Sequence, residues 1–329
     1  MLRLLASSFA LVFVAALVAT NTGFAGDINY PTETVRLIST FEAGGGNDFM
    51  ARVLAKKFSE EWKKTVIVED KTGGAGDIGT NYVAHITPDG NTLLVTTNAT
   101  IVINPQLFKH IVKFDPIKDF APVSLLARQP FLLVVNPNLP VKTFPDLINY
   151  AREHPDKLNF GSSGAGGGAH LSGEMLKAFL GLKMTHVPYK GVAPALQDVM
   201  AGHLDFMFAA LQTSLPFVKS GQLRALAVTS KKRNPAMPDI PSVSEFPGLA
   251  DFEADLWYGL LAPAKTDPAI IDKIYRATAE AFKDPDIRSK FEPNGTVLVG
   301  STPKEFADVI NSDLVKWVMV LKSAGMLSQ

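Results

Sequence analysis

The stretch VRLISTFEAGGGNDFMARVL, residues 35–54, joins a strand-like run, a glycine loop and the start of a helix. Val35 to Ser39 is mainly apolar, and after the loop apolar residues recur at helical spacing from Met50 to Trp62. The glycines at 44–46 let a ligand approach the backbone, and the unpaired N–H groups of the following helix attract an anion. The stretch therefore predicts an anion-binding loop within an α/β domain.

A second glycine-rich segment, Gly161 to His170, lies more than a hundred residues downstream of the first. A strand-like run ends at Phe160, and a helix is expected from His170 to Leu180. Strand-like and helix-like runs alternate along the chain, which is typical of mostly parallel sheets flanked by helices. We expect the two loops to lie on facing lobes with a ligand between them.

The length of 329 residues favours two lobes over a single core. The apolar run Leu256 to Ala262 suits a strand that passes from one lobe to the other, and Thr302 to Glu305 has the pattern of a capping box for the last helix. The terminal helices are expected to pack back on the first lobe. The sequence therefore predicts a discontinuous lobe 1 (residues 26–128 and 254–329), a lobe 2 (residues 129–253) and a hinge of two strands.

Residues 1–25 have the features of a signal peptide: a positive start, an apolar run from Leu4 to Ala19, and small residues before a cleavage site after Ala25. The chain contains no cysteine, which excludes disulfides, thiolate metal sites and cysteine nucleophiles. Lys plus Arg and Asp plus Glu balance at 32 each, so no basic field favours nucleic acid. We expect a soluble, exported protein of the bacterial periplasm that does not bind nucleic acid.

Two motifs allow other interpretations. Gly74 to Gly79 satisfies G-x-G-x-x-G after a strand, but Thr97 and Asn98 end the next strand where a dinucleotide site needs an acidic residue. A glycine turn at the wall of a cleft is favoured, and no cofactor is expected. Gly161 to Ala165 approaches a nucleophile elbow around Ser163, with histidines downstream, so an exported serine hydrolase stays an alternative. The length of the glycine run favours a ligand loop over an enzyme.

The remaining polar and aromatic candidates carry weaker signals. The six histidines lack metal-binding spacing, and His170 with Glu174 supplies too few ligands, so no metal is expected. Asp48 can satisfy backbone donors at the start of the first helix and thereby fix the loop for binding. Trp257 can stack on a ligand or pack where the lobes join, and the sequence favours neither.

The order of these pieces resembles the solute receptors of tripartite tricarboxylate transporters, the Bug or TctC family. The likeness runs from about Tyr30 to the C-terminus, and the order and number of the motifs make it specific. The motifs are, in chain order, Tyr30-Pro31, Val35 to Ile38, Gly44-Gly45-x-x-Asp48, Val66-x-Val68-Glu69, Gly74-x-Gly76-x-x-Gly79, Pro88-Asp89-Gly90, Asn104-Pro105, Asp119-Phe120-x-Pro122-Val123, His170-Leu171-x-x-Glu174, His186 to Gly191, Leu223 to Ala227 and Trp257-x-Gly259.

The resemblance implies a type II periplasmic-binding-protein fold, an α/β architecture of two lobes that closes on a small carboxylate. The family's ligands include di- and tricarboxylates, amino acids and aromatic acids, which pass to a membrane permease of the tripartite tricarboxylate transporter. We expect a monomer without a cofactor and without enzymatic activity. A sensory receptor that presents the same ligand to a membrane kinase is a further alternative.

The family's ligand loops correspond here to residues 41–48 and 162–170, which grip a carboxylate partly through ordered waters. The chain departs from the family at Glu42, where proline or a small residue is common, and at Gly167, where a hydroxyl residue is common. Both departures favour a less charged or bulkier acid over a citrate-like one. The resemblance places ligand-binding residues in these loops and at Thr97 and Asn98, and Ala209 and Trp257 are further candidates. The full set of candidate ligand-binding residues is Phe41, Gly44, Gly45, Asp48, Thr97, Asn98, Ser162, Ser163, Gly164, Ala165, Gly167, His170, Ala209 and Trp257.

Overall fold

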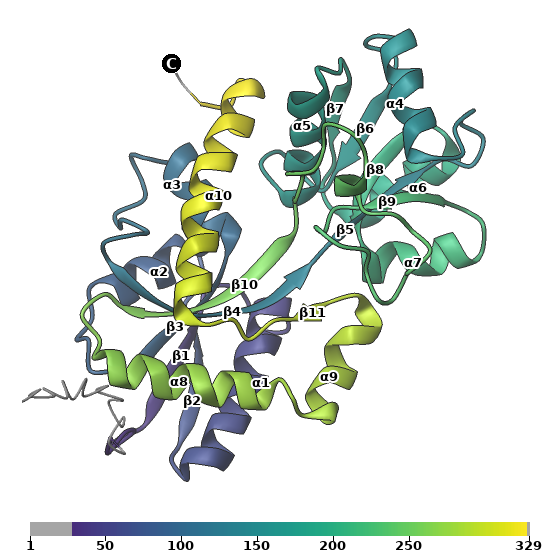
Figure 1. Ribbon diagram of the computed structural model, residues 1–329. Coiled ribbons are helices and arrows are strands. Elements are labelled where there is room, and N and C mark those ends of the chain that lie inside the picture. The colour runs from purple at the N-terminus through teal and green to yellow at the C-terminus, as the bar shows by residue number, and fades with distance from the viewer. Residues whose placement is uncertain (1–27, 328–329) are drawn as a thin grey trace, which may run out of the picture.

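The computed structural model describes residues 28–327, which form two lobes side by side (Figure 1). The predicted signal peptide, residues 1–25, lies outside the described residues. Lobe 1 contains β1 (Val35–Ser39), α1 (Gly46–Trp62), β2 (Val66–Asp70), η1 (Gly74–Gly76), α2 (Asp77–Ala84), β3 (Thr92–Thr97), η2 (Ala99–Ile103), α3 (Asn104–Leu107), β4 (Phe120–Gln129), β10 (Leu256–Pro263), α8 (Pro268–Ala281), α9 (Pro285–Phe291), η4 (Glu292–Asn294), β11 (Val297–Leu298) and α10 (Pro303–Ser323). Lobe 2 contains β5 (Phe131–Val135), α4 (Phe144–Glu153), β6 (Asn159–Ser162), α5 (Gly168–Leu180), β7 (Thr185–Pro188), α6 (Val192–Ala201), β8 (Phe206–Ala210), α7 (Leu211–Lys219), β9 (Arg224–Val228) and η3 (Val243–Glu245).

The sheet of lobe 1 has six strands in the order β11-β4-β10-β3-β1-β2. β1 pairs in parallel with β2 and β3, whereas β10 pairs antiparallel with β3 and β4. β10 therefore runs against the four strands β1 to β4, because it enters this sheet from lobe 2.

The sheet of lobe 2 has five strands in the order β7-β6-β8-β5-β9. β6 pairs in parallel with β7 and β8, and β5, which enters from lobe 1, pairs antiparallel with β8 and β9. Apart from the edge strand β11 of lobe 1, both lobes thus share one order: second strand, first strand, third strand, incoming strand, fourth strand. The predicted α/β fold with two mostly parallel sheets is confirmed.

Each glycine loop follows the first strand of its lobe. The loop after β1 leads into α1, and the loop after β6 leads into α5. In both sheets the strand order reverses beside this first strand, and open α/β sheets bind ligands at such a point. α5 begins at Gly168, two residues before the predicted start, because glycine is tolerated at the beginning of a helix.

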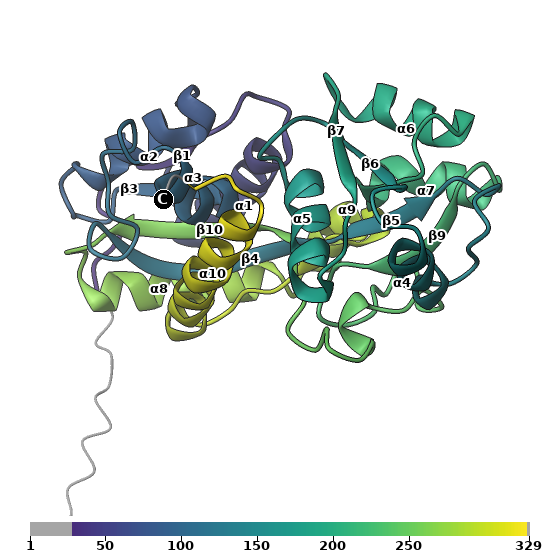
Figure 2. The same ribbon diagram turned by 90° about the horizontal axis from the view of Figure 1, so that it is seen from above.

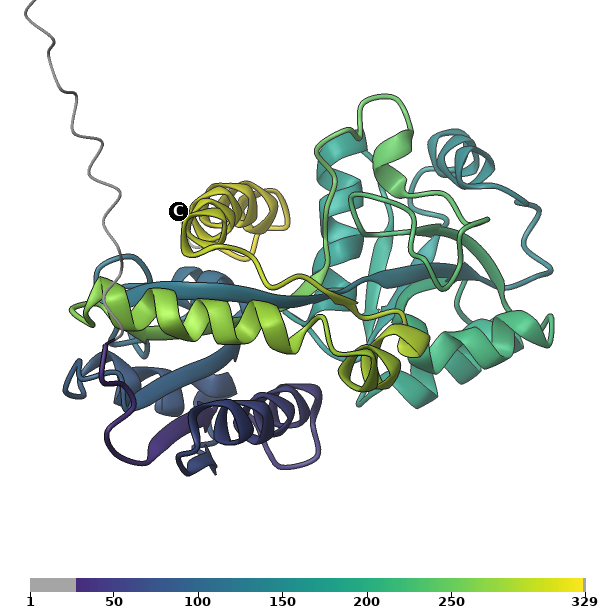
Figure 3. The same ribbon diagram turned by 60° about the horizontal axis from the view of Figure 1, so that its bottom comes forward.

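Helices cover both faces of the lobe 1 sheet (Figure 3). α1 and α8 bury side chains such as Leu54 and Ile274 in one apolar cluster, whereas α10 buries Trp317 in another cluster on the opposite face. Local signals set the ends of these helices. The predicted capping box of Thr302 and Glu305 is present at the start of α10, where each side chain bonds the other residue's backbone.

Two strands connect the lobes, so the predicted two-strand hinge is confirmed. β4 ends at Gln129 and continues after one proline into β5, and β10 begins at Leu256 as the chain leaves lobe 2. α10 also packs along α5 of lobe 2, and residues of both helices share one apolar cluster (Figure 2). We infer that the lobe boundaries, at residues 128/129 and 253/254, fall where these two strands pass between the lobes.

Candidate ligand-binding site

The loop of lobe 1 already contains a carboxylate of the protein. The N-cap of α1 is Gly45, which offers no side-chain acceptor. Asp48 Oδ2 accepts a hydrogen bond from Gly44 N–H at 2.8 Å, and Arg52 Nε lies 2.7 Å from Asp48 Oδ1. Burial raises the pKa of Asp48, but the hydrogen bonds from Arg52 and Gly44 outweigh it and hold the pKa below its usual value. The start of α1 therefore holds an internal anion.

A pocket of about 560 Å³ opens beside this loop. Thr40 is only 1% exposed, and its hydroxyl has no hydrogen-bond partner among residues 28–327. Glu42 is the single ionisable residue in the lining. The segment after β1 and the glycine turn before α2 supply the walls, which consist of Thr40, Phe41, Glu42, Ala43, Gly45, Thr72, Gly73, Ala75 and Gly76. The G-x-G segment therefore forms a pocket wall, as the glycine-turn interpretation expects.

The loop of lobe 2 is held by side chains without an acidic group. Ser162 Oγ accepts a hydrogen bond from Gly164 N–H at 3.2 Å and lies 2.6 Å from His186 Nε2. Gly166 N–H donates to His170 Nδ1 at 3.0 Å. The first turn of α5 contains no acidic residue, and the glycine before it provides no side-chain acceptor. The N–H groups at the start of α5 therefore stay available.

Two stacked histidines lie behind the loop of lobe 2. The ring centroids of His170 and His186 are 3.7 Å apart. Burial, followed by the neighbouring His170, lowers the pKa of His186 to about 4, and burial also lowers the pKa of His170. Both rings are therefore neutral at pH 7, and His170 Nδ1 can accept the bond from Gly166 N–H only in that state. The stack shapes the loop without adding charge to it.

Both helix starts lie against the strands that cross between the lobes. A Cβ placed on Gly46, the first residue of α1, would collide with Tyr258 Oη of β10. A Cβ placed on Gly168, the first residue of α5, would come within 2.6 Å of Phe131 Cζ of β5. Tyr258 Oη donates to Gln129 Oε1 at 3.1 Å, and Gln129 lies two residues before Phe131. The crossing therefore brings the two glycine loops to one end of the hinge.

Other predicted residues lie at strand ends and at the loop tip. Thr97 ends β3 and Asn98 follows it directly, and Asn98 Nδ2 donates to the backbone carbonyl of Asp255 at 2.8 Å. Thr97 Oγ1 is buried without a hydrogen-bond partner in the described part of the chain. Ser163 and Ala165 are exposed on the loop of lobe 2. Their open position makes these two residues the most accessible of the predicted set in lobe 2.

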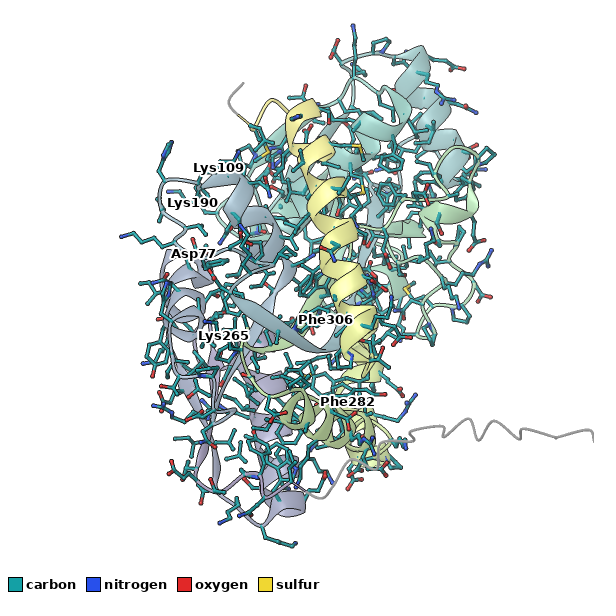
Figure 4. The ribbon with its side chains drawn as sticks, turned by 60° about the vertical axis from the view of Figure 1, so that its left-hand side comes forward. Asp77, Lys109, Lys190, Lys265, Phe282 and Phe306 are labelled. Atoms are coloured by element: carbon teal, nitrogen blue, oxygen red, sulfur yellow. The ribbon has the colours of Figure 1, made fainter. Side chains whose placement is uncertain are left out.

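Two predicted ligand residues belong to the apolar cores of the lobes. Trp257 is fully buried, its Nε1–H donates to Asp313 Oδ2 at 2.7 Å, and its ring packs edge-on against Phe306, labelled in Figure 4 beside α10. Neighbouring side chains of a strand alternate, so Tyr258 faces α1 instead. Of the two alternatives that the sequence left open for Trp257, the structure shows packing, and its place among the candidate ligand residues is corrected accordingly. Ala209 is 1% exposed in β8, and its side chain belongs to the core of lobe 2.

The geometry does not assemble a serine hydrolase. The contact to a histidine belongs to Ser162, which is fully buried, whereas Ser163 is exposed and bonds to no histidine. No carboxylate among residues 28–327 bonds to His186. The same residues contain no group of three or more side chains placed to hold a metal ion. Nor is any helix among them long and apolar enough to cross a bilayer.

Three residues of the site escaped the sequence analysis. Thr40 follows β1 directly, and a polar residue at the end of a buried strand is the signal that could have found it. His186 reaches Ser162 across 24 residues, and no local pattern reports such a contact. Tyr258 is next to Trp257 in β10, and its side chain lies on the opposite face of the strand. The sequence does not show which of the two faces lies toward the loops.

The profile described as "Tripartite tricarboxylate transporter family receptor" matches residues 50–326. The chain belongs to this family. A protein from the tcbD-tcbE intergenic region of Pseudomonas sp. strain P51 is 32% identical over 288 residues, which cover 88% of this chain and 85% of the relative. Protein BugT of Bordetella pertussis is 31% identical over 297 residues, 90% of each chain.

Solved structures of similar proteins show the same architecture. A protein of R. palustris solved with adipate is 33% identical with a TM-score of 0.71, and the match covers 90% of this chain and 98% of that one. MatC from Rhodopseudomonas palustris, solved with bound malate, is 29% identical with a TM-score of 0.68 and coverages of 88% and 100%. The predicted family and fold class are confirmed, and so is the predicted function as a receptor rather than an enzyme.

Proposed function

We propose that this receptor holds a small organic carboxylate through the glycine loop of lobe 2 and delivers it to a tripartite tricarboxylate transporter permease. The observation that carries the proposal is the start of α5, which combines a glycine N-cap with a first turn free of acidic residues. The N–H groups of Ser163 and Ala165 also donate to no group among residues 28–327. Relatives solved with adipate and malate support an organic acid as the ligand.

In the proposed complex, backbone N–H groups hold the carboxylate, and each such bond to a charged group contributes about 1.5 to 3 kcal/mol. The partial positive charge at the start of α5 adds to this attraction. Only a closed arrangement lets both lobes touch one ligand, so binding shifts the population toward closure. The proposed ligand residues are Phe41, Gly44, Gly45, Thr97, Asn98, Ser162, Ser163, Gly164, Ala165, Gly167 and His170, with Asp48 fixing the loop of lobe 1.

The proposal places the protein in the periplasm as a monomer. Relatives described as periplasmic, among them BugD at 31% identity, support this location. Residues 1–25 would direct export and be removed after Ala25. The permease would then recognise the closed form of the two lobes.

A thermal-shift screen over mono-, di- and aromatic carboxylates tests the binding function, because a ligand that binds only the folded protein raises its Tm. We expect at least one carboxylate to raise the Tm, and Ala165→Trp to abolish that rise by filling the loop mouth. The exposed Ala201 lies at the far end of α6, so Ala201→Trp is the matched control. No shift with any carboxylate, or equal shifts for both variants, would contradict the proposal.

A further inference from the structure

The two sides of the proposed site offer opposite charges to a ligand. On lobe 1, Glu42 lines the pocket, forms no ion pair with any residue between 28 and 327, and has no cationic neighbour in the lining. On lobe 2, the glycine loop and the first turn of α5 contain no carboxylate. The exposed Lys190 follows Tyr189, whose carbonyl lies beside Gly164, and Lys190 has no ion-pair partner among the described residues. A ligand that reaches both lobes would therefore meet an unpaired carboxylate on lobe 1 and, on lobe 2, the N–H groups of a helix start without a carboxylate.

The lobe 1 pocket also presents an unsatisfied polar group. Thr40 Oγ1 is buried without a partner in the part of the chain that the structure describes, and Thr40 belongs to the pocket lining. A buried hydroxyl without a hydrogen bond is costly, so a ligand group that pairs with it is favoured. Phe41 lines the same pocket, and the face of an aromatic ring attracts a cation. These neighbours suit a hydrogen-bonding cationic group better than an apolar tail.

We propose that the ligand is a zwitterion, with a carboxylate for the loop of lobe 2 and an ammonium group for the Glu42 wall of lobe 1. This inference rests on the proposed function and names the class of ligand within it. A dicarboxylate of the same length would place its second negative charge against Glu42, and like charges at such short range repel. Glu42 thereby selects amino acids over diacids.

The test compares pairs of ligands that differ in one end group: 4-aminobutanoate with glutarate, and 6-aminohexanoate with adipate. Isothermal titration of the wild-type protein should give tighter binding for the amino acid of at least one pair. Glu42→Gln should reduce that preference about tenfold, because the substitution weakens the binding of the amino acid and strengthens the binding of the diacid. The effect should shrink at high salt, since Glu42 is exposed.

Glu33→Gln is the matched control, because Glu33 is an exposed carboxylate of the same lobe that precedes β1, whereas Glu42 follows β1. This variant should leave the preference unchanged. A wild-type preference for diacids would overturn the inference while leaving carboxylate binding intact. An equal change for both ligands in Glu42→Gln would also overturn it, since Glu42 would then act on closure and not on ligand charge. If no carboxylate binds at all, the proposed function itself fails.

Discussion

The glycine loops of the two lobes occupy the same topological position and differ in charge. Each follows the first strand of its sheet, and each opens a helix with a glycine N-cap. In lobe 1, Asp48 in the first turn of α1 takes the N–H of Gly44, whereas in lobe 2 neutral histidines shape the loop. A repeated fold element thus provides two helix starts, of which the protein's own carboxylate occupies one.

The difference shows that the topology places free backbone N–H donors at both helix starts. The side chains nearby determine whether these donors bind a group of the protein or a ligand. A helix start carries about half a positive charge that one nearby anion largely satisfies. Asp48 satisfies it in α1, so the unoccupied start of α5 is the stronger place for a ligand carboxylate. Three expected effects test this comparison.

The largest expected effect concerns the packing of the two helix starts against the strands that connect the lobes. Gly46→Ala should lower the free energy of unfolding by about 2 kcal/mol, because its Cβ would collide with the buried Tyr258. Gly168→Ala should cost about 1 kcal/mol, because the partly exposed Phe131 ring has more room to yield. Urea unfolding of the two variants measures both costs.

A double variant separates the collision from other effects of the alanine. Tyr258→Phe removes the hydroxyl that the new Cβ would meet, so adding it to Gly46→Ala should recover about half of the lost stability. An unchanged cost in the double variant would show that α1 does not dock on β10 as described.

The second effect is a pH dependence confined to lobe 2. His186 has a pKa of about 4 in the folded state, below the usual 6.5, so between these values only the unfolded chain binds the proton. The stabilising contribution is present above pH 6.5 and is lost as the pH falls toward 4. The difference in unfolding free energy between wild type and His186→Gln should therefore grow by about 1 kcal/mol from pH 4 to 6.5, a value discounted for the exposure of the ring.

The comparison with the variant is needed because a second group acts in the opposite direction. Burial raises the pKa of Asp255 to about 7, so the folded state binds a proton there that the unfolded state has released. Asp255 therefore favours folding toward low pH over the same range. Parallel pH profiles for wild type and His186→Gln would contradict a neutral, partly buried histidine behind the loop.

The smallest effect concerns the internal anion of lobe 1. Asp48→Asn keeps an oxygen for Gly44 N–H but removes the charge, which should cost about 0.5 kcal/mol of stability. The start of α1 would then lack a negative charge, as the start of α5 does. Diacids such as adipate should therefore bind several-fold tighter, as measured by isothermal titration. Asp146→Asn is the control, because Asp146 holds the same third helical position in α4. It should lose similar stability, and an equal gain in diacid affinity there would refute the explanation.

Much of the fold followed from local patterns. Alternating strand-like and helix-like runs predicted the α/β lobes, the apolar run from Leu256 predicted the crossing strand, and the capping box at Thr302 predicted the start of α10. The predicted loops at 41–48 and 162–170 follow the first strands of the two sheets. Trp257 was the clear exception, because strand alternation does not say which face of a strand meets the core and which a ligand.

The sequence by itself determined the two lobes, the two glycine loops and the family, because these depend on periodicity, turn residues and motif order along the chain. Only the tertiary structure decided that Trp257 turns to α10, that His186 reaches Ser162, and that Glu42 lines a pocket without a cation. Such contacts join residues far apart in the chain. Their partners are chosen by how the sheets twist and pack, and no local pattern records that choice.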